Sequence, residues 1–386
     1  MKIIYITLII LILCTACSSA DHSEESSSRP DFDQIPEFEP QELFSISTFG
    51  EGDFFGFISS INIDSSESIL VSDPSNQKIH VFDKDGTYLN FIGGDGEGPG
   101  EFRRLASVSF IAPDTLHAVD RSLNRISFFS KSDESWELLH TLDTPESSLG
   151  FGSEIVFSFS SLYPHKDGYL ARFTNMMTIA DTANHSFAYY KLLDEQLNLL
   201  NENKYLFELT STPLLHRDSG SMSVSPLPES HRMLFSNTVD GVKISTWSGD
   251  NLISIRQITG NDSTGFRFPS KYEPYTDQEI EAIINRIIPD PSNSIFSRTA
   301  LRDLIPEHKD YSLQLLVDDK GRIWILTRPL LEDDPEWLIF DQQGTLLAAM
   351  HHPGGRLAHI KNNRIYVIHS EVDTEPFFSV YKFSEE

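Results

Sequence analysis

Short apolar runs separated by turn residues recur along the chain from about residue 42 onward. Between Phe57 and Gly93 there are four such runs, FISSINID, ILVSD, KIHVFD and TYLNFIG, and the segments between them are rich in Ser, Asn, Asp and Gly. Residues 105–143 repeat this pattern as LASVSFIA, TLHAVD, RISFFS and WELLHTLD. Such runs, four to eight residues long and bounded by turn residues, are typical of strands in an antiparallel meander. The pattern predicts two consecutive four-stranded sheets.

The two copies also agree residue by residue. Asp73 is followed at a fixed distance by Lys78-Ile79, and Asp120 is followed at the same distance by Arg125-Ile126. In each copy the aspartate ends one predicted strand and the basic residue begins the next. The connection at residues 91–102, FIGGDGEGPGEF, has a shorter counterpart at residues 48–54, and its glycines allow positive φ angles in a tight connection.

Weaker copies follow at residues 161–207, 222–260, 313–351 and 356–383. The last copy shows only three strands, and residues 42–49 supply the missing outer strand. The prediction is an all-β fold, a six-bladed β-propeller with four-stranded antiparallel blades, whose ring is closed by the two ends of the chain. Five or seven blades, or a jelly roll or sandwich, are the alternatives.

The amino end is typical of a secretory signal. Lys2 precedes an apolar run over residues 3–13, which is too short to span a bilayer, and small residues lead to Cys17. The order Cys14-Thr15-Ala16-Cys17 resembles the bacterial lipobox, except that Cys14 stands where Leu is usual. We therefore expect a signal peptide at residues 1–16, lipidation of Cys17 and a disordered acidic tether at residues 17–40, with the propeller domain at residues 41–386. An ordinary secretory signal is the alternative.

These motifs together resemble known families. The run ILVSDPSNQKIHVFDKDG and the connection GGDGEGPGEF are similar to NHL-repeat and TolB-like six-bladed propellers, and with the lipobox they resemble the propeller lipoproteins of Bacteroidetes. The resemblance covers residues 42–383 as an architecture, with its sharpest motifs in residues 44–130. It implies a cell-envelope protein anchored by lipid to the outer membrane, facing the periplasm or the cell surface.

The repeating pattern of short predicted strands is interrupted at residues 274–307. Thr276 and Glu279 form a capping box, the run EIEAIINRII has helical spacing, and residues 296–305 read as a second helix. This predicts a helical insertion between blades four and five, acting either as a lid or docking element or as packing against the side of the ring.

Composition narrows the functional classes. The chain has 386 residues with 30 Lys+Arg and 57 Asp+Glu, a net charge of −27, so binding to nucleic acid or to anionic membrane surfaces through charge is disfavoured. The candidate ligand face of a propeller carries the connections between blades and the turns between second and third strands. The candidate binding residues there are Asp73, Lys78, Arg103, Arg104, Asp120, Arg121 and Arg125. Alternatively, Asp73 and Asp120 accept backbone N–H bonds in their turns and pair with the basic residue that follows.

The sequence predicts no catalytic residues and no metal centre. It lacks a Gly-x-Ser-x-Gly elbow and a phosphate-binding loop. His351 and His352 are adjacent, with His359 and His369 nearby, but neighbouring residues on a strand point to opposite faces. The main hypothesis is a binding or scaffolding module for a cell-envelope protein, peptide or glycan, without a cofactor. The alternative is a calcium-dependent hydrolase or lyase of the lactonase-like propeller type, for which Asp64, Asp318 and Asp319 are the available inner-strand acids.

Overall fold

The structure is a computed structural model of the chain. It describes residues 31–132, 135–145, 157–175, 186–200, 274–288, 298–305, 307, 309, 312–328, 333–370 and 374–384, together with the backbone of the strands at residues 205–209, 213–218, 221–226, 234–238, 241–248, 252–257 and 263–267. Among the helices in these segments, none is long and apolar enough to cross a membrane.

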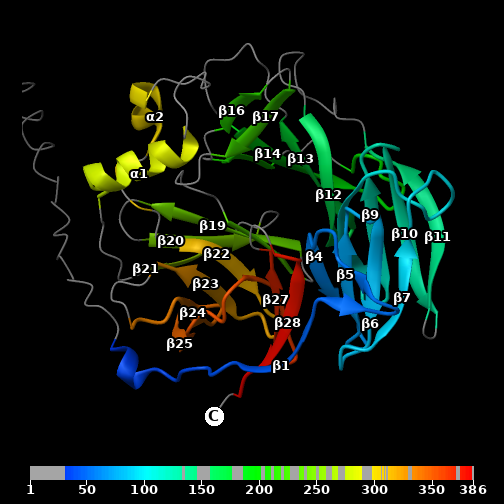
Figure 1. The fold of residues 1–386 in the computed structure, drawn as a ribbon, viewed down its shortest axis with the longest axis horizontal. Coiled ribbons are helices and arrows are strands. Elements are labelled where there is room, and N and C mark those ends of the chain that lie inside the picture. The colour runs from blue at the N-terminus through cyan, green and yellow to red at the C-terminus, as the bar shows by residue number, and fades with distance from the viewer. Residues whose placement is uncertain are drawn as a thin grey trace, which may run out of the picture.

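The described strands form six antiparallel four-stranded sheets, the blades, and two smaller hairpins (Figure 1). Blade one contains β4 (Ser60–Ile63), β5 (Ile69–Asp73), β6 (Lys78–Phe82) and β7 (Tyr88–Gly93); blade two contains β8 (Leu105–Ala112), β9 (Thr115–Asp120), β10 (Arg125–Ser132) and β11 (Ser135–Asp143); blade three contains β12 (Phe157–His165), β13 (Gly168–Asn175), β14 (Ser186–Leu193) and β15 (Tyr205–Leu209). Blade four contains β18 (Leu234–Thr238), β19 (Gly241–Ser248), β20 (Leu252–Gln257) and β21 (Ser263–Arg267); blade five contains β22 (Ser312–Val317), β23 (Ile323–Thr327), β24 (Trp337–Phe340) and β25 (Leu346–Met350); blade six contains β26 (Arg356–Lys361), β27 (Arg364–His369), β28 (Phe377–Lys382) and β1 (Gln41–Ile46).

The blades form a closed ring. The first strands of neighbouring blades contact one another, β4 with β8, β8 with β12, β18 with β22, β22 with β26 and β26 with β4, and β12 also contacts β19 of blade four. In blade six, β1 pairs antiparallel with β28, with Gln41 opposite Lys382 and Ile46 opposite Phe378. This confirms the predicted ring and its closure by strands from both ends of the chain.

The middle strands are buried on both sides because each blade is sandwiched between two others. In β5, Ile69, Leu70 and Val71 are all fully buried. Ile69 and Val71 pack towards blade six, in a cluster that includes Phe378, whereas Leu70 packs towards blade two with Phe102. Strands covered on both faces read as continuous apolar runs rather than as alternating ones, which explains the ILVSD pattern.

The extra elements of the chain stand on one face of the ring. Each sheet runs in sequence order from its first to its fourth strand, so the connections between blades and the turns between second and third strands share one face, here named the loop face. The additional elements in these connections are the hairpin β2 (Thr48–Phe49) and β3 (Asp53–Phe54), the hairpin β16 (Pro213–Asp218) and β17 (Ser221–Pro226), and the helices α1 (Asp277–Ile287) and α2 (Arg298–Leu304). The turns between first and second strands, and between third and fourth, lie on the opposite face.

The predicted helical insertion is confirmed. Thr276 caps α1 and forms the capping box with Glu279. The two helices share a small core of their own that includes Ile284 and Leu301. This core lets the insertion keep its shape in the connection from blade four to blade five.

Two predicted boundaries differ from the structure. The fourth repeat was predicted at residues 222–260, whereas blade four runs from Leu234 to Arg267, so the predicted start falls inside β17 and the predicted end falls before β21. The predicted tether boundary at residue 40 also lies too far along the chain. The short 3-10 helix η1 (Phe32–Gln34) packs on blade five, and Phe38 stacks on Phe383 with ring centroids 4.9 Å apart.

Candidate functional site

Two of the predicted ligand-face residues are structural anchors. Asp73 is fully buried and accepts hydrogen bonds from the backbone N–H groups of Gly56 (2.9 Å) and Phe57 (3.1 Å). Asp120, also fully buried, accepts them from Arg103 (2.7 Å) and Arg104 (3.3 Å). In both blades the aspartate therefore fixes the connection that enters the blade.

The protonation of Asp73 fits this anchoring role. Burial by itself would raise the pKa of Asp73, but the neighbouring imidazole of His80, 3.7 Å away, and the hydrogen bonds from Gly56, Asn76 and Phe57 outweigh burial. The pKa is therefore held below its ordinary value, and the side chain stays an acceptor for these donors. The part of the alternative in which both aspartates accept backbone N–H bonds in their turns agrees with the structure, where Asn76 donates to Asp73 and Ser122 and Leu123 donate to Asp120.

The predicted ion pairs between each aspartate and the following basic residue are wrong. The Nζ of Lys78 lies 4.3 Å from the ring centroid of Phe91, and the guanidinium of Arg125 donates to the carbonyl oxygens of Glu97, Gly98 and Glu101. The aspartate oxygens are already occupied by backbone N–H groups, so the basic side chains find other acceptors or an aromatic face.

Arg125 also holds the glycine-rich connection between blades one and two in place. Its three carbonyl contacts fix this loop from the side of blade two, and Gly98 N–H donates to the Glu101 carboxylate (2.8 Å). Gly93 has φ +94°, and a Cβ there would lie 2.3 Å from the ring of Phe102. Only glycine fits both constraints, so the loop is a rigid scaffold rather than a phosphate cradle.

Arg103 belongs to the same loop and is already neutralised. Its guanidinium lies 3.5 Å from Asp95 and 3.3 Å from Glu97. Of the predicted basic residues this leaves Arg104 and Arg121. Within the described residues, neither of their guanidinium groups forms an ion pair or a hydrogen bond.

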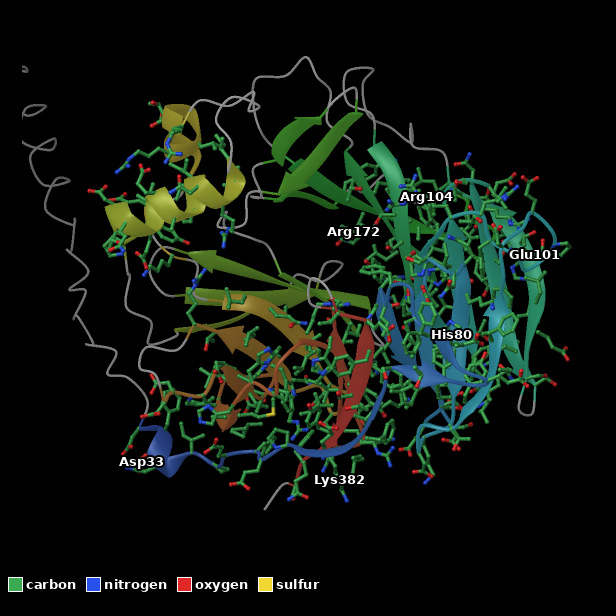
Figure 2. All side chains as sticks on the ribbon, in the orientation of Figure 1. Asp33, His80, Glu101, Arg104, Arg172 and Lys382 are labelled. Atoms are coloured by element: carbon green, nitrogen blue, oxygen red, sulfur yellow. The ribbon has the colours of Figure 1, made fainter. Side chains whose placement is uncertain are left out.

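Arg104 and Arg121 are brought together by the backbone, since the N–H of Arg121 donates to the carbonyl of Arg104 (3.1 Å). Arg172, on β13, joins them from blade three; Figure 2 labels Arg104 and Arg172. Burial lowers the pKa of Arg121, and the positive charges of Arg104 and Arg172 lower it further. We name these three residues the arginine cluster. Arg172 was not predicted, because it lies inside a strand that shows no turn signal.

The acids of the opposite face have their own partners. Asp64 is fully buried and accepts from Lys131 Nζ (2.6 Å) of blade two, while Asp318 accepts from Arg322 Nε (2.6 Å). Asp319 accepts from the N–H of Asn362 (3.0 Å). In the described segments no three His, Cys, Asp or Glu side chains are grouped as a metal site would require. These contacts give no support to a calcium site built from the three acids.

The histidines are also separately engaged. His351 lies 3.4 Å from both Glu37 and Glu336, and the Nδ1 of His352 accepts from the indole N–H of Trp337 (2.9 Å). Burial lowers the pKa of His359 to about 4, so this side chain is neutral at physiological pH. His369 stacks on Phe377, with ring centroids 4.2 Å apart.

Comparison with known proteins identifies the family. Residues 51–262, more than half of the chain, match the model of the family described as 6-bladed beta-propeller, DUF5128. The chain belongs to this family. Six blades, rather than five or seven, therefore follow both from the family and from the sheets observed. No curated protein matches the sequence.

Several solved structures resemble this family member in fold. A protein of Bacteroides fragilis described as exported is 13% identical, with 93% of this chain and 98% of that chain covered and a TM-score of 0.47. A DUF4221 family member from Bacteroides vulgatus is 9% identical, with coverages of 91% and 99% and a TM-score of 0.49. A streptogramin B lyase is 11% identical, with coverages of 90% and 98% and a TM-score of 0.39. At these values the likeness concerns the propeller fold alone.

Proposed function

We propose that this propeller is an exported, lipid-anchored binding module of the cell envelope that presents its loop face to an anionic protein, peptide or glycan. The signal sequence and Cys17 support export and anchoring. The arginine cluster supports the nature of the ligand, and it is the observation that carries the proposal.

The distribution of charge favours an anionic ligand. The chain has a net charge of −27, yet Arg104 and Arg121 lie together without a carboxylate partner among the described residues. Placing like charges side by side costs free energy, and here it also lowers the pKa of Arg121. An anionic group bound between these guanidinium groups removes this cost and gains charge-assisted hydrogen bonds.

Rigidity adds to the argument. Asp120 holds the backbone of Arg103 and Arg104, and the Arg121 N–H is bonded to the Arg104 carbonyl. Guanidinium groups carried on a fixed backbone lose less conformational freedom when a ligand binds. The loop face also carries the hairpins and helices of the chain, which extend the surface available to a large partner.

The ligand proposal is tested with short probes, because long polyanions are repelled by the acidic surface as a whole. Triglutamate, trigalacturonate and a heparin tetrasaccharide are titrated by calorimetry at 50 and 300 mM NaCl. We expect at least one probe to bind, and the double variant R104A/R121A to weaken it about tenfold or more, since two charge-assisted contacts are lost. The matched control is Arg103→Ala, whose guanidinium already has acidic partners, and it should change affinity less than about twofold.

Two outcomes would refute the ligand proposal: binding of none of the probes, or equal loss of affinity in R103A and R104A/R121A. The anchor is tested separately by mass spectrometry of the mature amino terminus. Diacylglycerol on Cys17 is expected, and an unmodified Cys17 would overturn the anchor without affecting the ligand proposal.

A further inference from the structure

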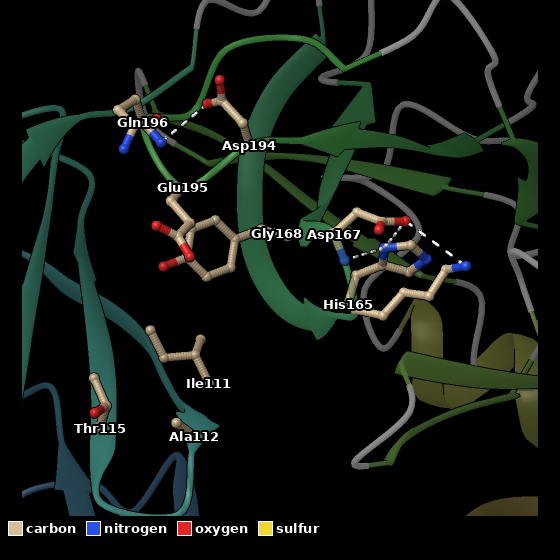
Figure 3. A pocket seen from close by; sticks show the side chains of 11 residues that line it. Ile111, Ala112, Thr115, His165, Asp167, Gly168, Asp194, Glu195 and Gln196 are labelled. Atoms are coloured by element: carbon tan, nitrogen blue, oxygen red, sulfur yellow. Dashed lines mark hydrogen bonds and ion pairs between the residues drawn. The ribbon is translucent and has the colours of Figure 1, made fainter.

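A pocket of about 560 Å³ opens on the opposite face, between blades two and three. Three turns surround it (Figure 3): the β8–β9 turn with Ala112 and Thr115, the β12–β13 turn with His165 and Asp167, and the β14–β15 turn with Glu195. The pocket is open to solvent, and its volume falls within the range of small-ligand sites. The pocket and the arginine cluster both involve blades two and three, but they lie at opposite ends of the strands.

The floor of the pocket is partly apolar. Tyr169 and Ile111 line it, and both are partly buried against the core cluster that joins blades two and three. The ring centroid of Tyr169 lies 6.1 Å from that of Phe128. Burial raises the pKa of Tyr169, and the charge of Glu195 raises it further, so the phenol remains a hydrogen-bond donor. Tyrosine thus offers an apolar ring and a polar tip at the same site.

The rim of the pocket mixes donors and acceptors. The Asp167 carboxylate lies 3.8 Å from His165 and 3.9 Å from Lys166. Glu195 is exposed, and its side chain forms no ion pair or hydrogen bond within the described part of the chain. Gln196 adds an amide, which can both donate and accept.

The turn that carries Glu195 is held in place from within. The Asp194 carboxylate accepts from the Asn198 side-chain amide (3.1 Å) and from the N–H groups of Asn198 (2.8 Å) and Gln196 (2.9 Å), and these hydrogen bonds, the Asn198 amide first, lower the pKa of Asp194. The neighbouring Glu195 is therefore presented on a fixed turn.

From this arrangement we infer that the pocket binds a neutral glycan. Sugars present C–H faces, which match Tyr169 and Ile111, and hydroxyl edges, which match the mixed rim of Asp167, Glu195 and Gln196. Three carboxylates line the pocket, which disfavours an anionic ligand. Asp167 is paired with His165 and Lys166, and Asp194 accepts from its own turn, so of the three carboxylates Glu195 alone would be left to pair with a cationic ligand. The inference is independent of the arginine cluster, so this member of the family would carry two sites of different chemistry.

The test is saturation-transfer NMR on the full mature chain. The neutral probes are maltotriose, xylotriose, mannotriose, chitotriose and galactobiose, and trilysine is the cationic comparison. We expect at least one sugar to bind and Glu195→Ala to weaken it about fivefold, the effect of losing one good hydrogen bond. Tyr169→Ala should weaken it more, and circular dichroism checks its fold because Tyr169 also packs on the core.

Matched controls keep the result specific. Glu137→Ala removes an exposed carboxylate from the outer strand of blade two, and R104A/R121A removes the arginine cluster; neither should change sugar affinity. Sugar binding should also be nearly independent of salt, since the ligand is uncharged. The inference is overturned if none of the five sugars binds, if trilysine binds in their place, or if Glu195→Ala leaves the affinity unchanged.

Discussion

Replacing Asp120 by alanine should lower both the stability of the fold and the affinity for the anionic probe. The Asp120 carboxylate accepts four backbone hydrogen bonds, which come from Arg103 (2.7 Å), Arg104 (3.3 Å), Ser122 (2.8 Å) and Leu123 (2.9 Å). These hydrogen bonds are partly buried, so about 1 kcal/mol for each, the middle of the usual range, is appropriate. We expect Asp120→Ala to lower the free energy of unfolding by about 4 kcal/mol.

Asp73→Ala is the matched control. Asp73 accepts four hydrogen bonds as well, from the N–H groups of Gly56 (2.9 Å), Phe57 (3.1 Å) and Asn76 (3.3 Å) and from the Asn76 amide (2.8 Å). Its loss should therefore cost a similar amount, about 4 kcal/mol. Asp73 does not hold Arg104 or Arg121, so binding of the anionic probe should weaken in Asp120→Ala alone.

The assay combines urea unfolding, followed by tryptophan fluorescence, with calorimetry at a temperature at which both variants remain folded. Asp120→Asn should fall between wild type and Asp120→Ala, because one amide oxygen can still accept from Ser122 and Leu123. Equal loss of probe binding in both alanine variants would show a global effect and refute the positioning role. An unchanged unfolding midpoint in Asp120→Ala would refute the anchor.

Two further predictions concern pH. Burial lowers the pKa of His117 from 6.5 to about 4, so the neutral side chain stabilises the fold above pH 6.5 and this stability is lost as pH falls towards 4; between pH 7.5 and 4.5 the loss is about 2.5 kcal/mol. Urea unfolding of His117→Gln should lack this component, whereas the exposed control His140→Gln should retain it, and parallel pH curves for wild type and His117→Gln would contradict the prediction. The Lys309 ammonium, then Thr276, lowers the pKa of Glu279 from 4.5 to about 2, so its contribution to α1 is present above pH 4.5 and disappears as pH falls through 2. Hydrogen exchange of the α1 amides should be faster in Glu279→Gln than in wild type at pH 7, and the difference should shrink steadily as pH falls from 4.5 towards 2; a difference that does not change with pH would count against this.

The strands of the ring could be predicted from the sequence where turn residues separate them clearly. Blades one and two have Asp, Asn and Gly at nearly every turn, so their strands could be placed to within a few residues. In the fourth blade the first three strands were placed, but the outer strand β21 was missed and the repeat was begun inside β17, because only the pairing of strands shows that β16 and β17 form a separate hairpin. Phe38 was assigned to the tether because a single aromatic in a polar segment has no period to reveal its packing on Phe383.

The candidate site was predicted less completely than the fold. Residue spacing suggested that Lys78 and Arg125 pair with their aspartates, but it could not show that backbone N–H groups already occupy those carboxylates. Arg172 escaped notice because an arginine in a strand interior looks like an ordinary solvent-facing position. The pocket around Tyr169 depends on turns from two blades, and such juxtaposition across blades leaves no local signal in the sequence.

Ring closure also determines when the fold can be completed and how the closed ring resists force. The hydroxyl groups of Ser45 and Ser379 lie 2.7 Å apart across the β1–β28 pairing, although the two residues are 334 positions apart in sequence. The last blade therefore cannot be completed until β28 has been synthesised, so the growing chain stays an open arc until its final strand is available. Once the ring has closed, a pull on the amino end first loads the segment before β1, where Glu37 pairs with Ala349 and Phe38 stacks on Phe383, so this segment shields the β1–β28 pairing that closes the ring.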